Sequence, residues 1–294
     1  MDISKIITKF YQLESFEITY FQRDDVSYST IEDRKVYVVI DQNGKKYILK
    51  QIQKNWLEGF EDIYTLLYQH QSSALIYPIC TIDGNYVAND WEYYYILMPF
   101  VKLVRVSMIS IPLLEGIIQL NNTCFSFPVL NHSSYLLDNE LKILEKKFKI
   151  YENLLKKTYI DYSKAVSILY EYRNMSKYFG ITYSSVSHTN FYTFQERLIC
   201  TDIDSIRLDN QLYFWIWLLF LVFYCHKDIL YRYTLYEFIF SEIWKKFTIS
   251  TQEFRIALLY YTLRPLIDIG RPLWRNEFII KNHFMKDILL FQWI

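Results

Sequence analysis

The first hundred residues alternate between hydrophobic and polar positions, a pattern typical of β-strands. Arg34–Ile40 and Lys46–Gln51 both alternate, and the Asp41–Gly44 segment between them contains Asn-Gly, a frequent hairpin turn. These three segments predict a β-hairpin. A turn around Asp83–Asn85 predicts a second hairpin, and the apolar stretch Glu92–Phe100 predicts a central strand.

Apolar residues at helical spacing appear over Trp56–Gln69 and dominate the chain beyond Pro112. Gly180 is expected to end one helix, with short strands over Phe191–Phe194 and Leu198–Thr201 after it. The later helices are expected over residues 136–155, 163–179, 212–226, 233–246, 251–263 and 276–291. The apolar run Leu212–Cys225 in the third of these helices is shorter than the ~20 residues that cross a bilayer. It therefore predicts a buried core helix and no transmembrane segment.

These patterns predict an α+β protein of two lobes. Residues 1–101 form the β-rich lobe and residues 102–294 the helical lobe. A chain of 294 residues is long enough to bury a sizeable core in such an arrangement. Neither a linker nor an internal repeat interrupts the sequence.

The composition of the chain argues against several classes of protein. Thirty-two basic and 32 acidic residues balance to a net charge of zero, which argues against a nucleic-acid binder. The N-terminal residues lack the apolar core of a signal peptide. The four cysteines show no metal or disulfide spacing, so we expect reduced, mostly buried thiols in a cytoplasmic protein. These are Cys80, Cys124, Cys200 and Cys225.

Several polar residues follow one another in the order of a kinase active site: Lys50 on a strand, Glu58 and Glu61 on a helix, then a polar loop over Tyr183–Thr193. The segment Thr201–Leu208, "TDIDSIRL", follows an apolar strand. This order resembles the protein-kinase-like superfamily, in its branch of aminoglycoside and choline phosphotransferases and their spore-coat relatives (CotS-like proteins). Their catalytic loop reads His-Gly-Asp-x-x-x-x-Asn, with a metal-binding Asp about a dozen residues later. The resemblance covers most of the chain and implies a two-lobed kinase-like fold.

The resemblance also implies ATP and Mg²⁺ as cofactors. Lys50 would contact the nucleotide phosphates, since a fixed ammonium group offsets their charge. Glu61 is the first choice for the carboxylate that pairs with this lysine, and Glu58 the second. The implied metal ligands are side chains with oxygen atoms, which Mg²⁺ prefers: Asn190, Asp202 and, as an accessory carboxylate, Asp204.

Each of these residues also has an ordinary structural interpretation. Lys50 would be a solvated lysine on an alternating strand, and Glu61 or Glu58 a solvated charge on a helix. Asp202 and Asp204 would form a turn or helix cap after a strand, as Asp commonly does.

The predicted catalytic loop departs from the family at its base. Counting back from Asn190, the catalytic aspartate position is held by Ser185, which cannot accept a proton as a carboxylate does. Loss of a positioned base typically costs about 10²–10⁴-fold in rate. His188 is a weak candidate for a substitute base, and otherwise an ordinary hydrogen-bonded loop histidine.

Two further departures point the same way. Residues 16–40 contain no glycine, although a phosphate-covering loop normally needs it, and Asp24 and Asp25 in that stretch would repel phosphate. Phe214 and Trp215 stand where the family has a bracing aspartate near the start of the long apolar helix, while Asp209 matches an earlier one.

The sequence therefore predicts a kinase-fold protein with impaired catalysis, a pseudokinase, that acts structurally or as a regulator through a protein partner. If the spore-coat resemblance holds, it would assemble into the coat of an endospore. The alternative is an active ATP- and Mg-dependent phosphotransferase acting on a small hydroxyl compound or a peptide. A third possibility is a module that binds nucleotide without transferring phosphate.

Overall fold

The computed structural model describes residues 2–20, 36–52, 60–69, 75–90, 93–102, 104–105, 109–125, 142–147, 150, 167, 170–171, 178–183, 191–194, 197–200, 206–266 and 274–291. The chain divides into two compact units, one of residues 1–106 with 188–207 and one of residues 107–187 with 208–294. The sequence predicted a boundary between two lobes at residue 101, and that boundary stays a prediction. The two compact units differ from it in one respect, because residues 188–207 belong to the same unit as the N-terminal part.

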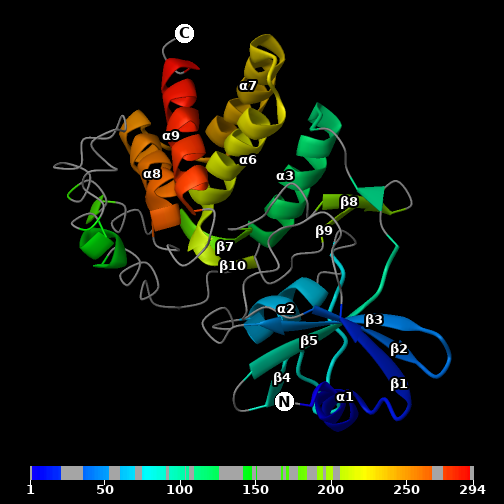
Figure 1. Cartoon of the computed structure of the whole chain (residues 1–294). Helices are drawn as coiled ribbons and strands as arrows, with labels where there is room; N and C mark the ends of the chain where they lie inside the picture. The colour runs from blue at the N-terminus through cyan, green and yellow to red at the C-terminus, as the bar shows by residue number, and fades with distance from the viewer. Residues whose placement is uncertain are drawn as a thin grey trace. The chain divides into compact units, whose positions relative to one another are not determined.

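A five-stranded antiparallel sheet forms the centre of the first unit (Figure 1), in the order β1-β2-β3-β5-β4. A second, three-stranded sheet has the order β6-β8-β9. The elements of this unit are α1 (Ile3–Tyr11), β1 (Phe16–Tyr20), β2 (Val36–Asp41), β3 (Lys46–Ile52), α2 (Phe60–Gln69), β4 (Ala88–Asp90), β5 (Tyr93–Pro99), β6 (Val104–Arg105), β8 (Phe191–Phe194) and β9 (Arg197–Cys200).

The core of the five-stranded sheet lies between one sheet face and α1. Alternate residues of β3, Tyr47 and Leu49, point into this core because successive strand residues point to opposite faces. Ile6 and Ile7 of α1 cover them and are almost fully buried. The two turns that shape the sheet contain Gly44 and Gly84, whose φ angles of 76° and 82° favour glycine.

Helices make up most of the second unit. They are α3 (Ile111–Phe125), α6 (Gln211–Cys225), α7 (Ile229–Lys246), α8 (Thr251–Leu263), a 3₁₀ turn (Arg264–Leu266) and α9 (Trp274–Phe291), with the paired strands β7 (Phe179–Tyr183) and β10 (Ile206–Asn210). Helix α6 packs against α7, α8 and α9. A capping box between Ser250 and Glu253 begins α8.

The structure confirms the stronger periodic predictions. The hairpin forms as β2 and β3, the central strand forms as β5, and the four C-terminal helices form as α6 to α9. Leu212–Leu219 are all buried, so α6 is the predicted core helix. Among the described residues, no helix is both long and apolar enough to span a membrane.

Other predictions were incomplete or wrong. The sequence patterns missed α1 and α3 altogether. Gly180 does not end a helix at residue 179, because Phe179 and Gly180 lie in β7. The prediction of buried thiols is wrong for the two cysteines whose side chains the structure describes, because Cys80 and Cys225 are exposed free thiols.

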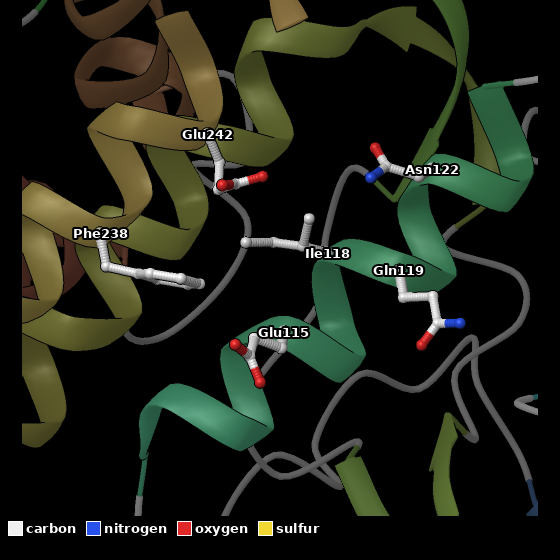
Figure 2. Close-up of a pocket in the computed structure, with 6 residues that line it drawn as sticks. All are labelled: Glu115, Ile118, Gln119, Asn122, Phe238 and Glu242. Carbon is white, nitrogen blue, oxygen red and sulfur yellow. The ribbon is translucent and has the colours of Figure 1, made fainter. Parts of the chain in front are cut away.

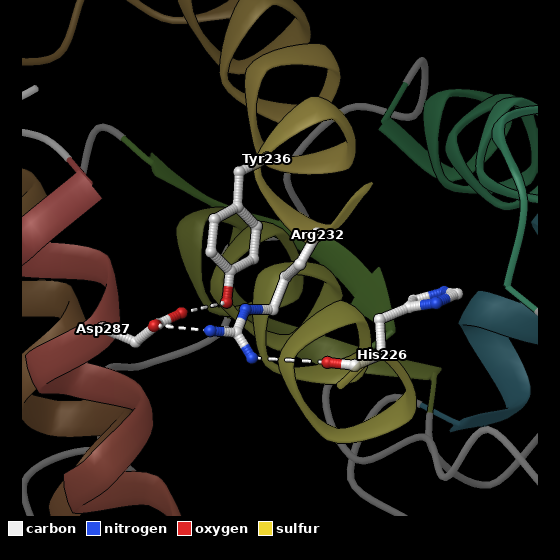
Figure 3. A network of polar contacts seen from close by, with 4 residues as sticks. All are labelled: His226, Arg232, Tyr236 and Asp287. Atoms are coloured by element: carbon white, nitrogen blue, oxygen red, sulfur yellow. Dashed lines mark hydrogen bonds and ion pairs between the residues drawn. The ribbon is translucent and has the colours of Figure 1, made fainter. Parts of the chain in front are cut away.

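A buried polar network joins three helices of the second unit (Figure 3). Arg232 Nη2 donates to Asp287 Oδ1 at 2.8 Å, and its Nη1 donates to the carbonyl oxygen of His226 at 3.3 Å. The Tyr236 hydroxyl donates to Asp287 Oδ2 at 3.0 Å. Burial and then the Asp287 carboxylate raise the pKa of Tyr236, so its hydroxyl stays protonated and available as a donor. The network ties α7 to α9 and to the end of α6.

We expect Asp287→Ala to lower the free energy of unfolding by about 3–5 kcal/mol, because Arg232 would remain buried without its partner. The two side chains are only 10% and 15% exposed. Urea denaturation measures the loss. The control is Glu242→Ala, which breaks an ion pair whose Lys245 side chain is 70% exposed and should cost about 0–1 kcal/mol. Equal losses of unfolding free energy in the two variants would show that the buried network contributes no more to stability than the exposed ion pair.

Candidate functional site

Lys50 lies on β3, an inner strand of the five-stranded sheet. It is the register partner of Val36 on β2 and of Ile96 on β5. The residue is half-buried, whereas Lys46 at the start of the same strand is exposed. Because side chains alternate along a strand, Lys50 projects from the face opposite the core residue Leu49. The predicted lysine therefore has a well-defined position with hydrogen-bonded strands on both sides.

Glu61 lies in α2, and its carboxylate contacts backbone rather than solvent. Oε2 accepts the N–H of Tyr86 at 2.9 Å, and Oε1 accepts the N–H of Val87 at 2.8 Å. Sequence analysis had no signal for these partners, which lie 25 and 26 residues further along the chain. Glu58, the second choice for the partner of Lys50, lies outside the described residues.

A short hairpin separates the two halves of the predicted metal motif. Strands β8 and β9 pair antiparallel, with Phe191 opposite Cys200. Strand β8 also pairs with β6, where Val104 is opposite Thr193. The predicted polar residues themselves lie outside the described part of the chain: Ser185, His188, Asn190, Asp202 and Asp204. Within the described residues, no group of three or more His, Cys, Asp or Glu side chains gathers as a metal site.

The segments on either side of the predicted loop are also defined. Strands β7 and β10 pair with each other. A Cβ on Gly180 of β7 would lie 2.3 Å from Nε2 of Gln211, so a larger residue here would require the Gln211 side chain at the start of α6 to move. Asn210 ends β10 and caps α6, with its side chain accepting the N–H of Leu212 at 2.9 Å. Phe214 and Trp215, near the start of α6, are both buried in the core.

An open cavity of about 250 Å³ lies in the second unit between α3 and α7 (Figure 2). Figure 2 shows Ile118 of α3 and Phe238 of α7 extending toward each other across the cavity. The carboxylates of Glu115 and Glu242 also line the cavity. Lys245 pairs with Glu242 at 2.6 Å. The remaining lining residues are the amides Gln119 and Asn122. The sequence did not predict this cavity, because its α3 wall was missed.

No protein-family model matches the chain, and no curated protein matches it in sequence. Solved structures do match. A spectinomycin phosphotransferase in complex with ADP and spectinomycin has a TM-score of 0.63 at 11% identity, covering 99% of this chain and 98% of that one. An amicoumacin kinase in complex with AMP-PNP, Ca²⁺ and Ami has a TM-score of 0.56 at 14% identity, covering 97% and 92%. Choline kinase from Streptococcus pneumoniae has a TM-score of 0.57 at 12% identity, covering 97% of each chain.

These likenesses, at 11–14% identity, define the fold. The chain has the two-lobed kinase-like α+β fold, with an antiparallel five-stranded sheet in its N-terminal part and a mostly helical C-terminal part. Its structural neighbours are aminoglycoside phosphotransferases and choline kinase, as the sequence resemblance implied.

We expect Asn210→Ala to lower the free energy of unfolding by about 0.5–2 kcal/mol, because the Leu212 N–H loses its acceptor at the start of α6. Asn210→Ser keeps a capping oxygen and serves as the control, with a smaller loss. Thermal and urea unfolding measure both variants. A loss in the serine variant as large as in the alanine variant would show that the cap contributes nothing.

Proposed function

We propose that this protein is an ATP- and Mg-dependent phosphotransferase that acts on a hydroxyl group of a small compound or a peptide. The observation that carries the proposal is the kinase-like fold over almost the whole chain, which it shares with solved structures of a phosphotransferase and two kinases. Two of those neighbours were solved with ADP or AMP-PNP, which supports nucleotide as the cofactor.

The chain's own residues fit this cofactor. Lys50, on an inner strand of the sheet, would supply positive charge to the nucleotide phosphates. The β8–β9 hairpin supports the metal assignment. At the end where Phe191 faces Cys200, the sequence continues by one peptide bond to Asn190 and by two to Asp202. Amide and carboxylate oxygens suit Mg²⁺, with Asp204 as an accessory ligand, and the metal would neutralise developing phosphate charge.

A second candidate function is a kinase-fold protein with impaired catalysis, a pseudokinase that works through a protein partner. The observation that favours it is Ser185 at the position of the family's catalytic aspartate. Phosphoryl transfer depends largely on positioning and charge stabilisation, so the serine lowers the rate without abolishing nucleotide chemistry. None of the neighbours named above is a spore-coat protein, and assembly into a spore coat stays a prediction.

We expect Mg-ATP at about a hundred times its Kd to stabilise the wild type by about 2.7 kcal/mol, a shift of a few degrees in Tm. Lys50→Met and Asp202→Ala should lose this shift, because each removes a group that holds the phosphates or the metal. Thermal unfolding with and without Mg²⁺ measures it. Lys46→Met is the control, since Lys46 is exposed on the same strand. No shift at millimolar ATP, or the same shift in all variants, would refute the proposed nucleotide site.

Ser185→Asp tests whether the missing base limits the reaction. Restoring a carboxylate should raise phosphoryl transfer by up to about 10²–10⁴-fold. Release of phosphate from ATP, with water as acceptor, provides the measurement when no substrate is known. Ser187→Asp adds the same charge two residues away and should leave the rate unchanged. Equal rates in wild type and Ser185→Asp would contradict impaired catalysis at this position.

A further inference from the structure

The carboxylate of Glu61 binds two consecutive backbone N–H groups, those of Tyr86 and Val87, at 2.9 and 2.8 Å. Each oxygen accepts one of them. In an extended strand, successive N–H groups point to opposite sides, so one carboxylate cannot accept both. Here the chain bends at Tyr86 and Val87, directly before β4 begins at Ala88. The bend turns both donors toward α2, and a carboxylate has two acceptor oxygens, one for each donor.

Aromatic packing holds the same two segments together. The ring of Tyr86 lies 5.9 Å from that of Tyr64 and 6.4 Å from that of Tyr68, both on α2. Tyr64 is fully buried and Tyr86 is 7% exposed. The N–H groups therefore lie where water is a poor substitute for the carboxylate, so they would be costly to leave unpaired.

The bend connects through the sheet to the strand of Lys50. Ala88 of β4 pairs with Tyr95 of β5, and the next residue, Ile96, pairs with Lys50 of β3. The two hydrogen bonds of Glu61 hold α2 against the start of β4. They therefore set the position of α2 relative to the β4 edge of the sheet.

We infer that Glu61 is a positioning residue that anchors α2 to the bend before β4, and that it is not the carboxylate that pairs with Lys50. Two charge-assisted hydrogen bonds already hold its two oxygens at the bend, and turning the carboxylate away from the bend would leave those N–H groups without an acceptor. This inference departs from the first choice made from the sequence for the partner of Lys50, and the double-mutant cycle below decides between them. The anchor itself is independent of nucleotide; only the role of Lys50 rests on the proposed function.

Amide hydrogen exchange tests the anchor directly. In the wild type, the amides of Tyr86 and Val87 should be protected. Glu61→Gln keeps the shape of the side chain but replaces one acceptor by a donor, so the amide that loses its acceptor should exchange about 5- to 150-fold faster. Asp62→Asn makes the same chemical change at the neighbouring exposed residue and should leave both rates unchanged. Unprotected amides in the wild type, or unchanged rates in Glu61→Gln, would overturn the inference.

A double-mutant cycle tests the second part of the inference, that Glu61 does not pair with Lys50. Lys50→Met and Glu61→Gln, alone and combined, are compared by urea unfolding in the absence of nucleotide. If the two residues do not pair, their effects on the unfolding equilibrium constant multiply to within about twofold. A coupling of more than about fivefold would show that they do pair and would overturn the inference. Since neither measurement needs ATP, a failure of the Mg-ATP thermal shift would count against the proposed function and leave this result standing.

Discussion

The burial of α6 is the constraint on which the helical unit depends. Ten of its fifteen residues are buried and include Trp215, Phe214 and Trp217. A helix that is apolar all round is stable only where neighbours cover all of its faces. The packing of α7, α8 and α9 against it meets this need. Phe220, for example, contacts Phe284 of α9 at 5.4 Å and Tyr261 of α8 at 5.7 Å between ring centroids. Burial of each such large side chain contributes about 1.5–3 kcal/mol.

Charges enter this core only together with partners. Asp287 faces both Arg232 and the Tyr236 hydroxyl (Figure 3). The ammonium group of Lys281, a residue that is 4% exposed, lies 4.0 Å from the centre of the Tyr261 ring. A buried charge without such contacts would pay a large desolvation penalty. The polar groups of the helical unit therefore specify how its helices pair, while apolar burial drives the packing.

Paired strands form a backbone framework around the candidate site. The inner strand with Lys50, the β8–β9 hairpin and the β7–β10 pair are all formed. The sequence has a serine at position 185 of the predicted loop, and Phe214 and Trp215 of α6 are core residues. Framework and chemistry can change separately because the hydrogen bonds of the strands involve the backbone, whereas proton transfer depends on one side chain.

The sequence by itself determined the elements whose signals are local. Alternation around Asn43-Gly44 predicts β2 and β3, and helical periodicity predicts α6 to α9. It also determined the chemistry available at each position, such as a hydroxyl at Ser185. Helix α1 was missed because a nine-residue helix is marginal alone and is stabilised by packing on the sheet. Helix α3 contains Gly116 and two asparagines, which lower its helix propensity.

Only the tertiary structure decided the contacts between distant segments. Gly180 has the propensity of a helix stop, yet it lies in β7, which pairs with the distant strand β10. Glu61 has the composition and place of a lysine partner, but the bend at Tyr86 and Val87 brings two backbone donors to its carboxylate. Residue type limits what a side chain can bind, and the folded chain decides which of those partners lies within hydrogen-bonding distance.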